Sequence, residues 1–397
     1  MIGADAGGLA GGGGVRTGGT GGQSGGAAAW LSVATDGQPP AAVEIAAAWT
    51  GRELLVWGGS GTCTATGACA GGARYRPDLD QWLPISALGA PGARALAASA
   101  WTGSVLAIWG GRACGNASAV CGDGALYDPV ADAWTKMEAA GAPSARGWAT
   151  AVWTGNAIVV WGGQSMVGGS LLGDGGAYDP IMRTWQPVPS VGAPSARRYH
   201  SAIWTGREVL IWGGNADPAR NLGLSDGAAY DPMTMVWRPM SAQGAPGTRW
   251  SHAALWTGKE MMIWGGVGCG ANPSSASLEQ CGDGALYDPA LDAWRPVSSV
   301  GAPTPRSGHS LVWSGREALV FGGGGGTCLV GSGGLCADGG RYDPMADRWA
   351  TLVPASADAA RAGHAACFTG TDLLVWGGIG PGEGEAPRFD GARLALP

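Results

Sequence analysis

Long apolar segments and an excess of basic residues are both missing from this sequence, and each absence excludes a class of protein. No run of 18 or more apolar residues occurs, so no transmembrane helix is expected. Lys and Arg together number 24 against 30 Asp and Glu, which gives a net charge of −6. Because phosphate recognition needs concentrated positive charge, this balance argues against a nucleic-acid binder or a polybasic membrane-surface protein. Phe (3) and Tyr (7) are scarce, whereas Trp (21) and Gly (75) are abundant.

The abundant Trp and Gly residues follow an internal repeat of about 52 residues. The triplet Trp-Thr-Gly, or a close variant, is followed eight positions later by Trp-Gly-Gly or Phe-Gly-Gly. The units then continue with Tyr-Asp-Pro or a variant, and most have a lone Trp seven residues after the Tyr. Seven such units occupy the chain from about residue 29 onward. Their first triplets begin at Trp49, Trp101, Trp153, Trp204, Trp256, Trp313 and Phe368.

Each unit predicts four short β-strands, which we label a to d. The apolar runs are short, are bounded by Gly or Pro, and are rich in β-branched and aromatic residues, which favours strands over helices. Four-stranded units repeated seven times predict an all-β fold, a seven-bladed β-propeller with four antiparallel strands per blade. The last unit lacks the Trp of strand d, but Trp30 precedes Trp49 at the spacing that this Trp would have. Residues 30–35 are therefore expected to close the last blade as an N-terminal strand and to remove an open sheet edge.

The first 28 residues differ in composition from the rest of the chain. Residues 1–28 carry 13 Gly and no aromatic residue, and we predict a Gly-rich flexible tether there. Residues 29–397 are predicted to form the propeller.

The repeat unit resembles the kelch repeat. The resemblance rests on Arg-x-x-His, an apolar strand that ends in Gly-Gly, then Tyr-Asp-Pro and Trp, and it covers about residues 29–390. It implies the propeller fold and a distant similarity to the propeller of galactose oxidase. It leaves function open, because kelch propellers serve as protein-binding scaffolds, as lectin-like modules and in a few enzymes.

Eight of the nine cysteines form pairs within single b–c loops. Such local pairs predict four disulfides, and the alternative of metal binding is weaker because each loop offers two thiols and no His. Disulfides indicate an oxidising compartment, so the protein is expected to be secreted, periplasmic or on the cell surface, although no signal peptide is visible in this chain. The ninth, Cys367, is expected to be a small buried residue, the alternative being the Tyr-linked Cys of copper radical oxidases. The pairs are Cys63 and Cys69, Cys114 and Cys121, Cys269 and Cys281, and Cys328 and Cys336.

An Arg and an acidic residue recur together in six units and are both missing from the first, which has Ala42 and Gly71 in their places. We predict a structural Arg–carboxylate ion pair within each of these six blades. A cation site built from the acids is the alternative. The expected pairs are Arg94 and Asp123, Arg146 and Asp174, Arg197 and Asp226, Arg249 and Asp283, Arg306 and Asp338, and Arg361 and Glu385.

All four histidines share one repeat position, three residues after the Arg: His200, His252, His309 and His364. We expect them to form structural hydrogen bonds. Four neighbouring blades could also present a His cluster near the axis, but metal ligation needs a tight geometry, so no metal and no cofactor is predicted.

Three aromatic residues lie outside the repeat framework: Trp148, Tyr199 and Trp250. They fall at the start of strand a in consecutive units, on the face that carries the b–c loops, and Arg198 adds a charge beside them. Aromatic surfaces with a few polar groups bind sugars and peptides, so these four residues are the predicted ligand site. The alternative is that the rings only plug the mouth of the channel. Loops 164–173 and 215–225, which lack Cys, are expected at the rim.

The sequence therefore predicts an extracytoplasmic, monomeric binding or scaffold module for a glycan or protein ligand. A copper radical oxidase-like or mutarotase-like carbohydrate enzyme is the first alternative, and it is weakened because no catalytic constellation stands outside the framework. A structural component of a cell-surface assembly is the second alternative.

Overall fold

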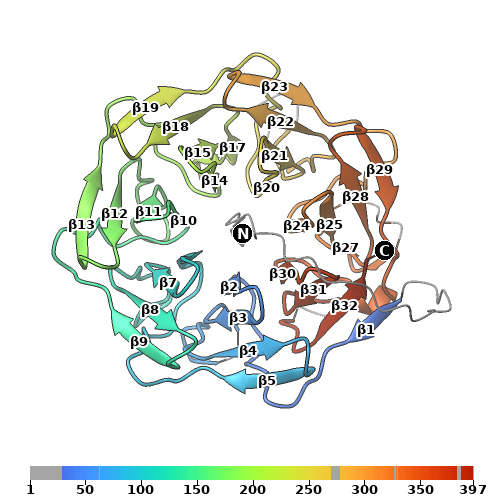
Figure 1. The fold of residues 1–397 in the computed structure, drawn as a ribbon, viewed down its shortest axis with the longest axis horizontal. Helices are drawn as coiled ribbons and strands as arrows, with labels where there is room; N and C mark the ends of the chain where they lie inside the picture. Colours follow the sequence, from blue (N-terminus) through green and yellow to red (C-terminus); the bar gives the residue numbers. More distant parts are fainter. Residues whose placement is uncertain are drawn as a thin grey trace, which may run out of the picture.

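Seven four-stranded antiparallel sheets surround a central axis in the computed structural model (Figure 1). The structure describes residues 29–396 except 62, 270–277, 326, 327, 329 and 382–385. The predicted all-β, seven-bladed β-propeller is confirmed. The predicted tether, residues 1–28, lies outside the described residues. Within the described residues, no helix is long and apolar enough to span a membrane.

The two inner strands of each blade are built from small and branched apolar residues. Strand b is fully buried in six blades, and in blade 7 it is buried except at Asp372, because neighbouring blades cover both of its faces. In order from blade 1 to blade 7, strand a is β2 (Ala46–Trp49), β6 (Ala98–Trp101), β10 (Thr150–Trp153), β14 (Ser201–Trp204), β20 (Ala253–Trp256), β24 (Ser310–Trp313) and β30 (Ala365–Phe368). Strand b is β3 (Leu54–Trp57), β7 (Leu106–Trp109), β11 (Ile158–Trp161), β15 (Val209–Trp212), β21 (Met261–Trp264), β25 (Ala318–Phe321) and β31 (Asp372–Trp376).

The two outer strands carry the Tyr and the lone Trp of the repeat. In the same order, strand c is β4 (Gly72–Arg76), β8 (Gly124–Asp128), β12 (Gly175–Asp179), β18 (Gly227–Asp231), β22 (Gly284–Asp288), β28 (Gly339–Asp343) and β32 (Gly391–Ala395). Strand d is β5 (Gln81–Pro84), β9 (Ala133–Lys136), β13 (Thr184–Val188), β19 (Val236–Pro239), β23 (Ala293–Pro296), β29 (Arg348–Thr351) and β1 (Trp30–Ser32). Small hairpins, β16 (Asn215–Asp217) with β17 (Leu222–Gly223) and β26 (Gly331–Ser332) with β27 (Leu335–Cys336), and the short 3-10 helix η1 (Ala357–Ala359) complete the described elements.

The N-terminal strand closes the ring, as the spacing of Trp30 predicts. β1 pairs antiparallel with β32, and Trp30 lies opposite Leu394. In Figure 1 the blue β1 lies beside the red β32, so the two ends of the propeller share one sheet. Trp30 occupies the place that Trp237 takes opposite Tyr230 in blade 4.

The register of blade 7 differs from the sequence expectation by five residues. The sequence places Phe389 at the repeat position of the Tyr, but the strand pairing puts Leu394 there, opposite Leu373. Phe389 is exposed instead. Phe389-Asp390 imitates the Tyr-Asp pair, which is why the pattern alone misplaces the strand. The acid four residues before the true position is Asp390.

Aromatic pairs hold neighbouring blades together at all seven junctions. The last aromatic residue of each strand b contacts the strand-d Trp of the next blade, as Trp57 contacts Trp134 with ring centroids 5.7 Å apart. The seventh junction uses Phe321 and Trp30, at 4.5 Å. Each strand-d indole N–H also donates to a backbone carbonyl of the preceding blade, as Trp134 donates to Ser86 at 2.8 Å. Large rings therefore fill the wedge-shaped space between blades.

Candidate functional site at the channel mouth

Seven residues with left-handed backbone conformation surround the axis where the d–a loops enter strand a. Backbone hydrogen bonds join several of them from blade to blade, as when the Trp148 N–H donates to the Leu96 carbonyl at 3.3 Å. The side chains at this position therefore form a ring at the mouth of the central channel. From blade 1 to blade 7 they are Glu44, Leu96, Trp148, Tyr199, Ser251, Gly308 and Gly363.

A second ring comes from the residue that follows each Gly-Gly. This residue pairs with the residue just before the left-handed position, so that each b–c loop is joined to the d–a loop of its own blade. From blade 1 to blade 7 the second ring is Ser60, Arg112, Gln164, Asn215, Val267, Gly324 and Ile379. The two rings place the b–c and d–a loops on one face, as the strand order predicts.

The structure brings the three predicted aromatic residues into one cluster. Tyr199 stacks on Trp250 with ring centroids 5.4 Å apart, and Trp148 meets Tyr199 edge-on at 6.4 Å. The Trp148 indole N–H donates to the Tyr199 hydroxyl at 2.9 Å. Trp148 is only 9% exposed, whereas Tyr199 and Trp250 are partly exposed. Trp148 thus supports the cluster from behind, and the other two rings are available to a ligand.

Two guanidinium groups flank this cluster. The Arg198 guanidinium lies 5.4 Å from the Trp148 ring and 5.0 Å from the Tyr199 ring, and Arg112 lies 5.8 Å from Trp148. Gln164 accepts a hydrogen bond from Arg198 at 2.7 Å and donates its amide N–H to the Gly169 carbonyl, so it fixes the position of the Arg198 side chain. Glu44 lies 3.6 Å from Arg112. The mouth therefore carries two cations against one carboxylate among these residues.

Sequence reasoning missed Arg112, Gln164 and Glu44. The signal that could have found them is positional. Each occupies a repeat position in one of the two rings of the mouth, and the residue type there varies from blade to blade while the framework stays constant. Loop 215–225, expected at the rim, forms the β16–β17 hairpin beside the mouth.

The mouth is asymmetric. Blades 1 to 4 contribute large, polar and charged side chains, and Trp250 of blade 5 stands at the edge of that half. Blades 6 and 7 contribute mainly small residues, together with Ile379: Ser307, Gly308, Gly324, Ala362 and Gly363. Below these small residues the channel contains a cavity of about 180 Å³ whose lining includes Ser251, His309 and His364. A second cavity of about 90 Å³ lies against blades 1 to 5, and its lining includes Leu96, Trp148 and Tyr199.

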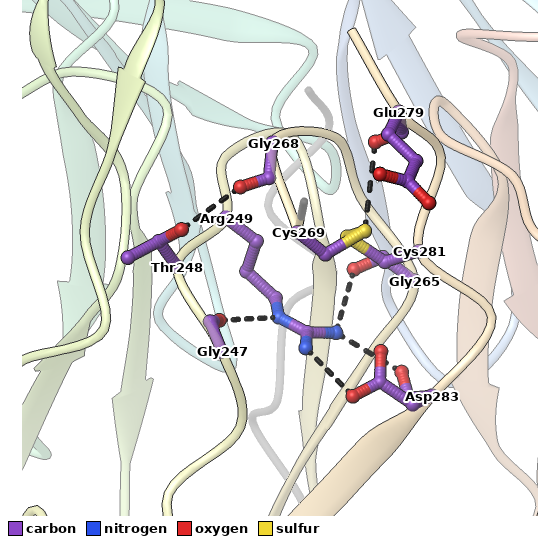
Figure 2. Close-up of a disulfide and its surroundings, with 9 residues drawn as sticks. All are labelled: Gly247, Thr248, Arg249, Gly265, Gly268, Cys269, Glu279, Cys281 and Asp283. Atoms are coloured by element: carbon purple, nitrogen blue, oxygen red, sulfur yellow. Dashed lines mark hydrogen bonds and ion pairs between the residues drawn. A yellow bond between two sulfur atoms is a disulfide. The ribbon is translucent and has the colours of Figure 1, made fainter. Parts of the chain in front are cut away.

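The recurrent Arg residues are buried and bind the turn between strands b and c of their own blade. Figure 2 shows Arg249 between Gly247, Gly265 and Asp283, beside the Cys269–Cys281 disulfide. The Arg249 guanidinium donates to the backbone carbonyls of these three residues and to the Asp283 carboxylate at 2.9 Å. Arg94, Arg146, Arg197 and Arg306 form the same ion pairs with Asp123, Asp174, Asp226 and Asp338, each at 3.0 Å.

The pair in blade 7 is a correction. Arg361 pairs with Asp390 at 3.1 Å, because the strand register puts Asp390 at the repeat position; Glu385 lies outside the described residues. Burial lowers the pKa of Arg361 to about 10, while Asp390 opposes the shift, so this Arg remains charged at neutral pH. These acids are engaged by Arg, which argues against a cation site built from them.

The four expected cysteine pairs are close enough for disulfides, with Cα–Cα distances of 5.0, 5.6, 5.7 and 5.3 Å in chain order. Each closes a b–c loop of the mouth face. Cys367 is buried, and burial raises the pKa of its thiol, so it stays protonated. Among the described residues, the grouping of potential metal ligands is Cys328, Cys336 and Asp338, and its two sulfur atoms are those of a disulfide.

The histidines lie between blades. His200 meets the Thr150 hydroxyl of the preceding blade at 2.9 Å, and His252 and His364 meet the Ser201 and Ser310 hydroxyls, each at 3.0 Å. Burial lowers the pKa of His200 and of His309 to about 3, and the neighbouring Arg adds to this shift. Burial also holds the pKa values of His252 and His364 well below the ordinary range. All four imidazoles are therefore neutral at physiological pH.

Comparison with known proteins agrees with this architecture. The family model described as the KLHDC2/KLHL20/DRC7 Kelch-repeats domain matches residues 148–378. Acyl-CoA-binding domain-containing protein 4 of Arabidopsis thaliana is 33% identical over 208 residues, which are 50% of this chain and 29% of that protein. Kelch domain-containing protein 3 of Bos taurus is 27% identical over 286 residues, 67% of this chain and 72% of the relative. Adagio-like protein 1 of Oryza sativa subsp. japonica is 28% identical over 324 residues, 75% and 50% of the two chains.

Proposed function

Because this chain belongs to the kelch-repeat domain family, whose propellers mediate protein interactions, we propose that it is a protein-binding module and that its ligand site is the channel mouth. The observation that carries the proposal is the cluster of Tyr199 and Trp250, partly exposed, beside the Arg198 guanidinium. Aromatic rings offer a large apolar contact area with a polar group at one end, and a cation beside them adds a charged donor, so the cluster can recognise a ligand that has both an apolar and an acidic group.

The charges favour a peptide segment with a carboxylate. Gln164 orients Arg198, and the described residues hold no carboxylate against its guanidinium, so Arg198 can form a charge-assisted hydrogen bond with an incoming acid. The Tyr199–Trp250 pair offers apolar area to the side chain next to that acid. Aromatic and Arg residues with this arrangement supply most of the binding energy in protein interfaces.

A glycan ligand, the other possibility that the sequence leaves open, has less support. Sugar platforms need an open aromatic face, and Trp148 is buried with the Arg112 and Arg198 guanidinium groups 5.8 and 5.4 Å from its ring. The enzyme alternatives have less support, because three of the four histidines, His200, His252 and His364, form hydrogen bonds with hydroxyl groups of the preceding blade.

Extracytoplasmic location is proposed on the four disulfides alone. Each bridge closes a short loop of the binding face, and such bridges persist where the environment is oxidising. The disulfides would thereby hold the b–c loops in the shape that presents the mouth.

The test is selection of peptides from a random library displayed on phage, with a glycan array run beside it. We expect the wild type to enrich peptides with an Asp, a Glu or a free C-terminal carboxylate next to an apolar residue. Arg198→Ala should weaken the selected peptides about 10- to 100-fold, the value of a charge-assisted hydrogen bond. Tyr199→Ala with Trp250→Ala should abolish binding.

A matched control carries substitutions on the opposite face. Val130, Ile181 and Met345 are exposed at c–d turns, so their replacement by Ala removes apolar area without touching the mouth. This triple variant should bind like the wild type. Enrichment of peptides whose binding survives the mouth substitutions, or glycan binding alone, would reject the proposal.

A further inference from the structure

The hydrogen bonds between the histidines and the preceding blade are broken at one position. His200, His252 and His364 each meet a hydroxyl at the first residue of strand a in the preceding blade. At the same position before His309 stands Ala253. Consequently, the Nε2 atom of His309, which would meet that hydroxyl, has no hydrogen-bond partner among the described residues. The Trp264 backbone forms a hydrogen bond with the same imidazole.

This imidazole is buried beside a cavity. His309 is 8% exposed, and both His309 and Ala253 belong to the lining of the cavity of about 180 Å³ in the channel. A buried polar atom without a partner is costly, and native proteins rarely leave one without a reason. A cavity and an unused ring nitrogen therefore occur together at this point.

The ring of left-handed residues at the mouth is interrupted at three junctions. Backbone hydrogen bonds join Tyr199 to Ser251 and Gly308 to Gly363. Among the described residues, no such bond joins Ser251 to Gly308, and none joins Trp148 to Tyr199 or Gly363 to Glu44. Because Gly308 and Gly363 have no side chains, the mouth leads into the cavity beside His309.

The chemistry of the lining selects the kind of guest. The lining consists of Ala, Gly, Ser, Leu, Val and His, with no Asp, Glu, Lys or Arg. Arg306, the nearest recurrent Arg, is paired with Asp338. A charged guest would lose its hydration without a counter-ion, which is costly, whereas the free nitrogen of the neutral His309 imidazole can form a hydrogen bond with an uncharged polar group.

We propose that the gap between Ala253 and His309 is a binding position for an uncharged small molecule that carries a hydroxyl or carboxamide group. The guest enters on the side of blades 5 to 7 and places its polar group where Ser201 and Ser310 place their hydroxyls in other blades. This site is separate from the Arg198 and Tyr199 surface proposed to bind peptides.

The experiment uses the full chain labelled with ¹⁵N at histidine, because the protein has only four His and each imidazole can be followed by NMR. The probes are acetamide and glycerol, with acetate as the charged analogue of acetamide. His309→Asn identifies the His309 signals. We expect acetamide and glycerol to shift these signals saturably and acetate to leave them unchanged.

Two Ala→Ser variants make the result specific. Ala253→Ser supplies the missing hydroxyl at a position where neighbouring blades already hold Ser, so the fold should accept it, and the response to both probes should be lost. Ala98→Ser adds a hydroxyl at the same repeat position where the next blade has Ala149 instead of His, and the response should persist. The proposal is overturned if acetate acts like acetamide, if Ala253→Ser still responds, or if neither probe shifts His309 at any concentration at which the protein stays folded. Peptide binding by Arg198→Ala tests only the proposed peptide site at the mouth, and its result does not affect the proposed site beside His309.

Discussion

Individual buried imidazoles couple the stability of this propeller to pH. In the folded chain the pKa of His200 and of His309 is about 3, because burial disfavours the charged ring, against about 6.5 in an unfolded chain. Between these two values the unfolded state binds protons that the folded state does not. Stability is therefore fully present above pH 6.5 and is lost as the pH falls below it.

We predict that acidification from pH 7 to pH 4.5 lowers the free energy of unfolding with a slope that approaches four protons. Most carboxylates titrate below this window, so the histidines dominate it. Replacing His309 by Gln should reduce the proton uptake on unfolding by about one proton. Urea denaturation at half-unit pH steps measures the slope. A slope unchanged by His309→Gln would show that His309 titrates alike in both states.

Residue-scale features show what periodicity can and cannot predict. The Arg–Asp pairs were accessible from the sequence because both partners recur and are lost together in blade 1. The partner of Arg361, Asp390, could not be predicted in this way. Phe389-Asp390 resembles the Tyr-Asp pair of the repeat, but the strand pairing places Leu394 at the position of the Tyr. The sequence pattern of blade 6 alone also does not predict that His309 lacks a hydroxyl partner, because that partner would come from a different blade, at Ala253.

At the scale of single elements, the c–d turns join neighbouring blades through hydrogen bonds of an Asp side chain. The Asp132 carboxylate accepts the Tyr127 hydroxyl at 2.6 Å and the backbone N–H of Ser86, which belongs to the d–a connection, at 3.0 Å. Asp80, Asp292 and Asp347 repeat this arrangement. In blade 4 the position is Met235, and the backbone that would donate is at Pro189, which has no N–H.

Substitution of Asp132 by Ala should destabilise the protein by about 2 kcal/mol, because two donors lose a charged acceptor. Chemical denaturation measures this loss. The control is Asp36→Ala, which removes an exposed carboxylate and should change stability by less than about 0.5 kcal/mol. Equal denaturation midpoints for the two variants would mean that water replaces the hydrogen bonds of Asp132 at no cost in stability.

The element scale also explains why the four-strand pattern was predictable while the mouth was only partly so. Strand periodicity and Gly-Gly turns recur seven times, and so the meander follows from local residues. Trp148, Tyr199 and Trp250 were found because they depart from that pattern. The roles of Arg112 and Gln164 depend on contacts with residues of a neighbouring blade, Trp148 and Arg198, which the repeat pattern of a single blade does not contain.

For the whole molecule, closure of the ring depends on three residues from the start of the described chain. Blade 7 receives strand d from β1, which no turn connects to β32, so only pairing and packing keep it in place. Trp30 contributes its contact with Phe321 and donates its indole N–H to the Val353 carbonyl at 2.8 Å. In blade 6 the corresponding Trp349 lies in a strand that a turn joins to its neighbour.

Substitution of these two Trp residues should therefore affect the stability of the propeller in different ways. Trp349→Ala should lower global stability by about 3–5 kcal/mol, the cost of truncating a core Trp. Its strand stays in the sheet because a turn joins it to the neighbouring strand. Trp30→Ala should detach β1 instead, which exposes the β32 edge while the other six sheets remain folded. Hydrogen exchange followed by mass spectrometry separates the outcomes. Amides of β31 and β32 should exchange faster in Trp30→Ala at unchanged protection elsewhere, and uniform loss of protection across all blades would show that closure is cooperative with the whole ring.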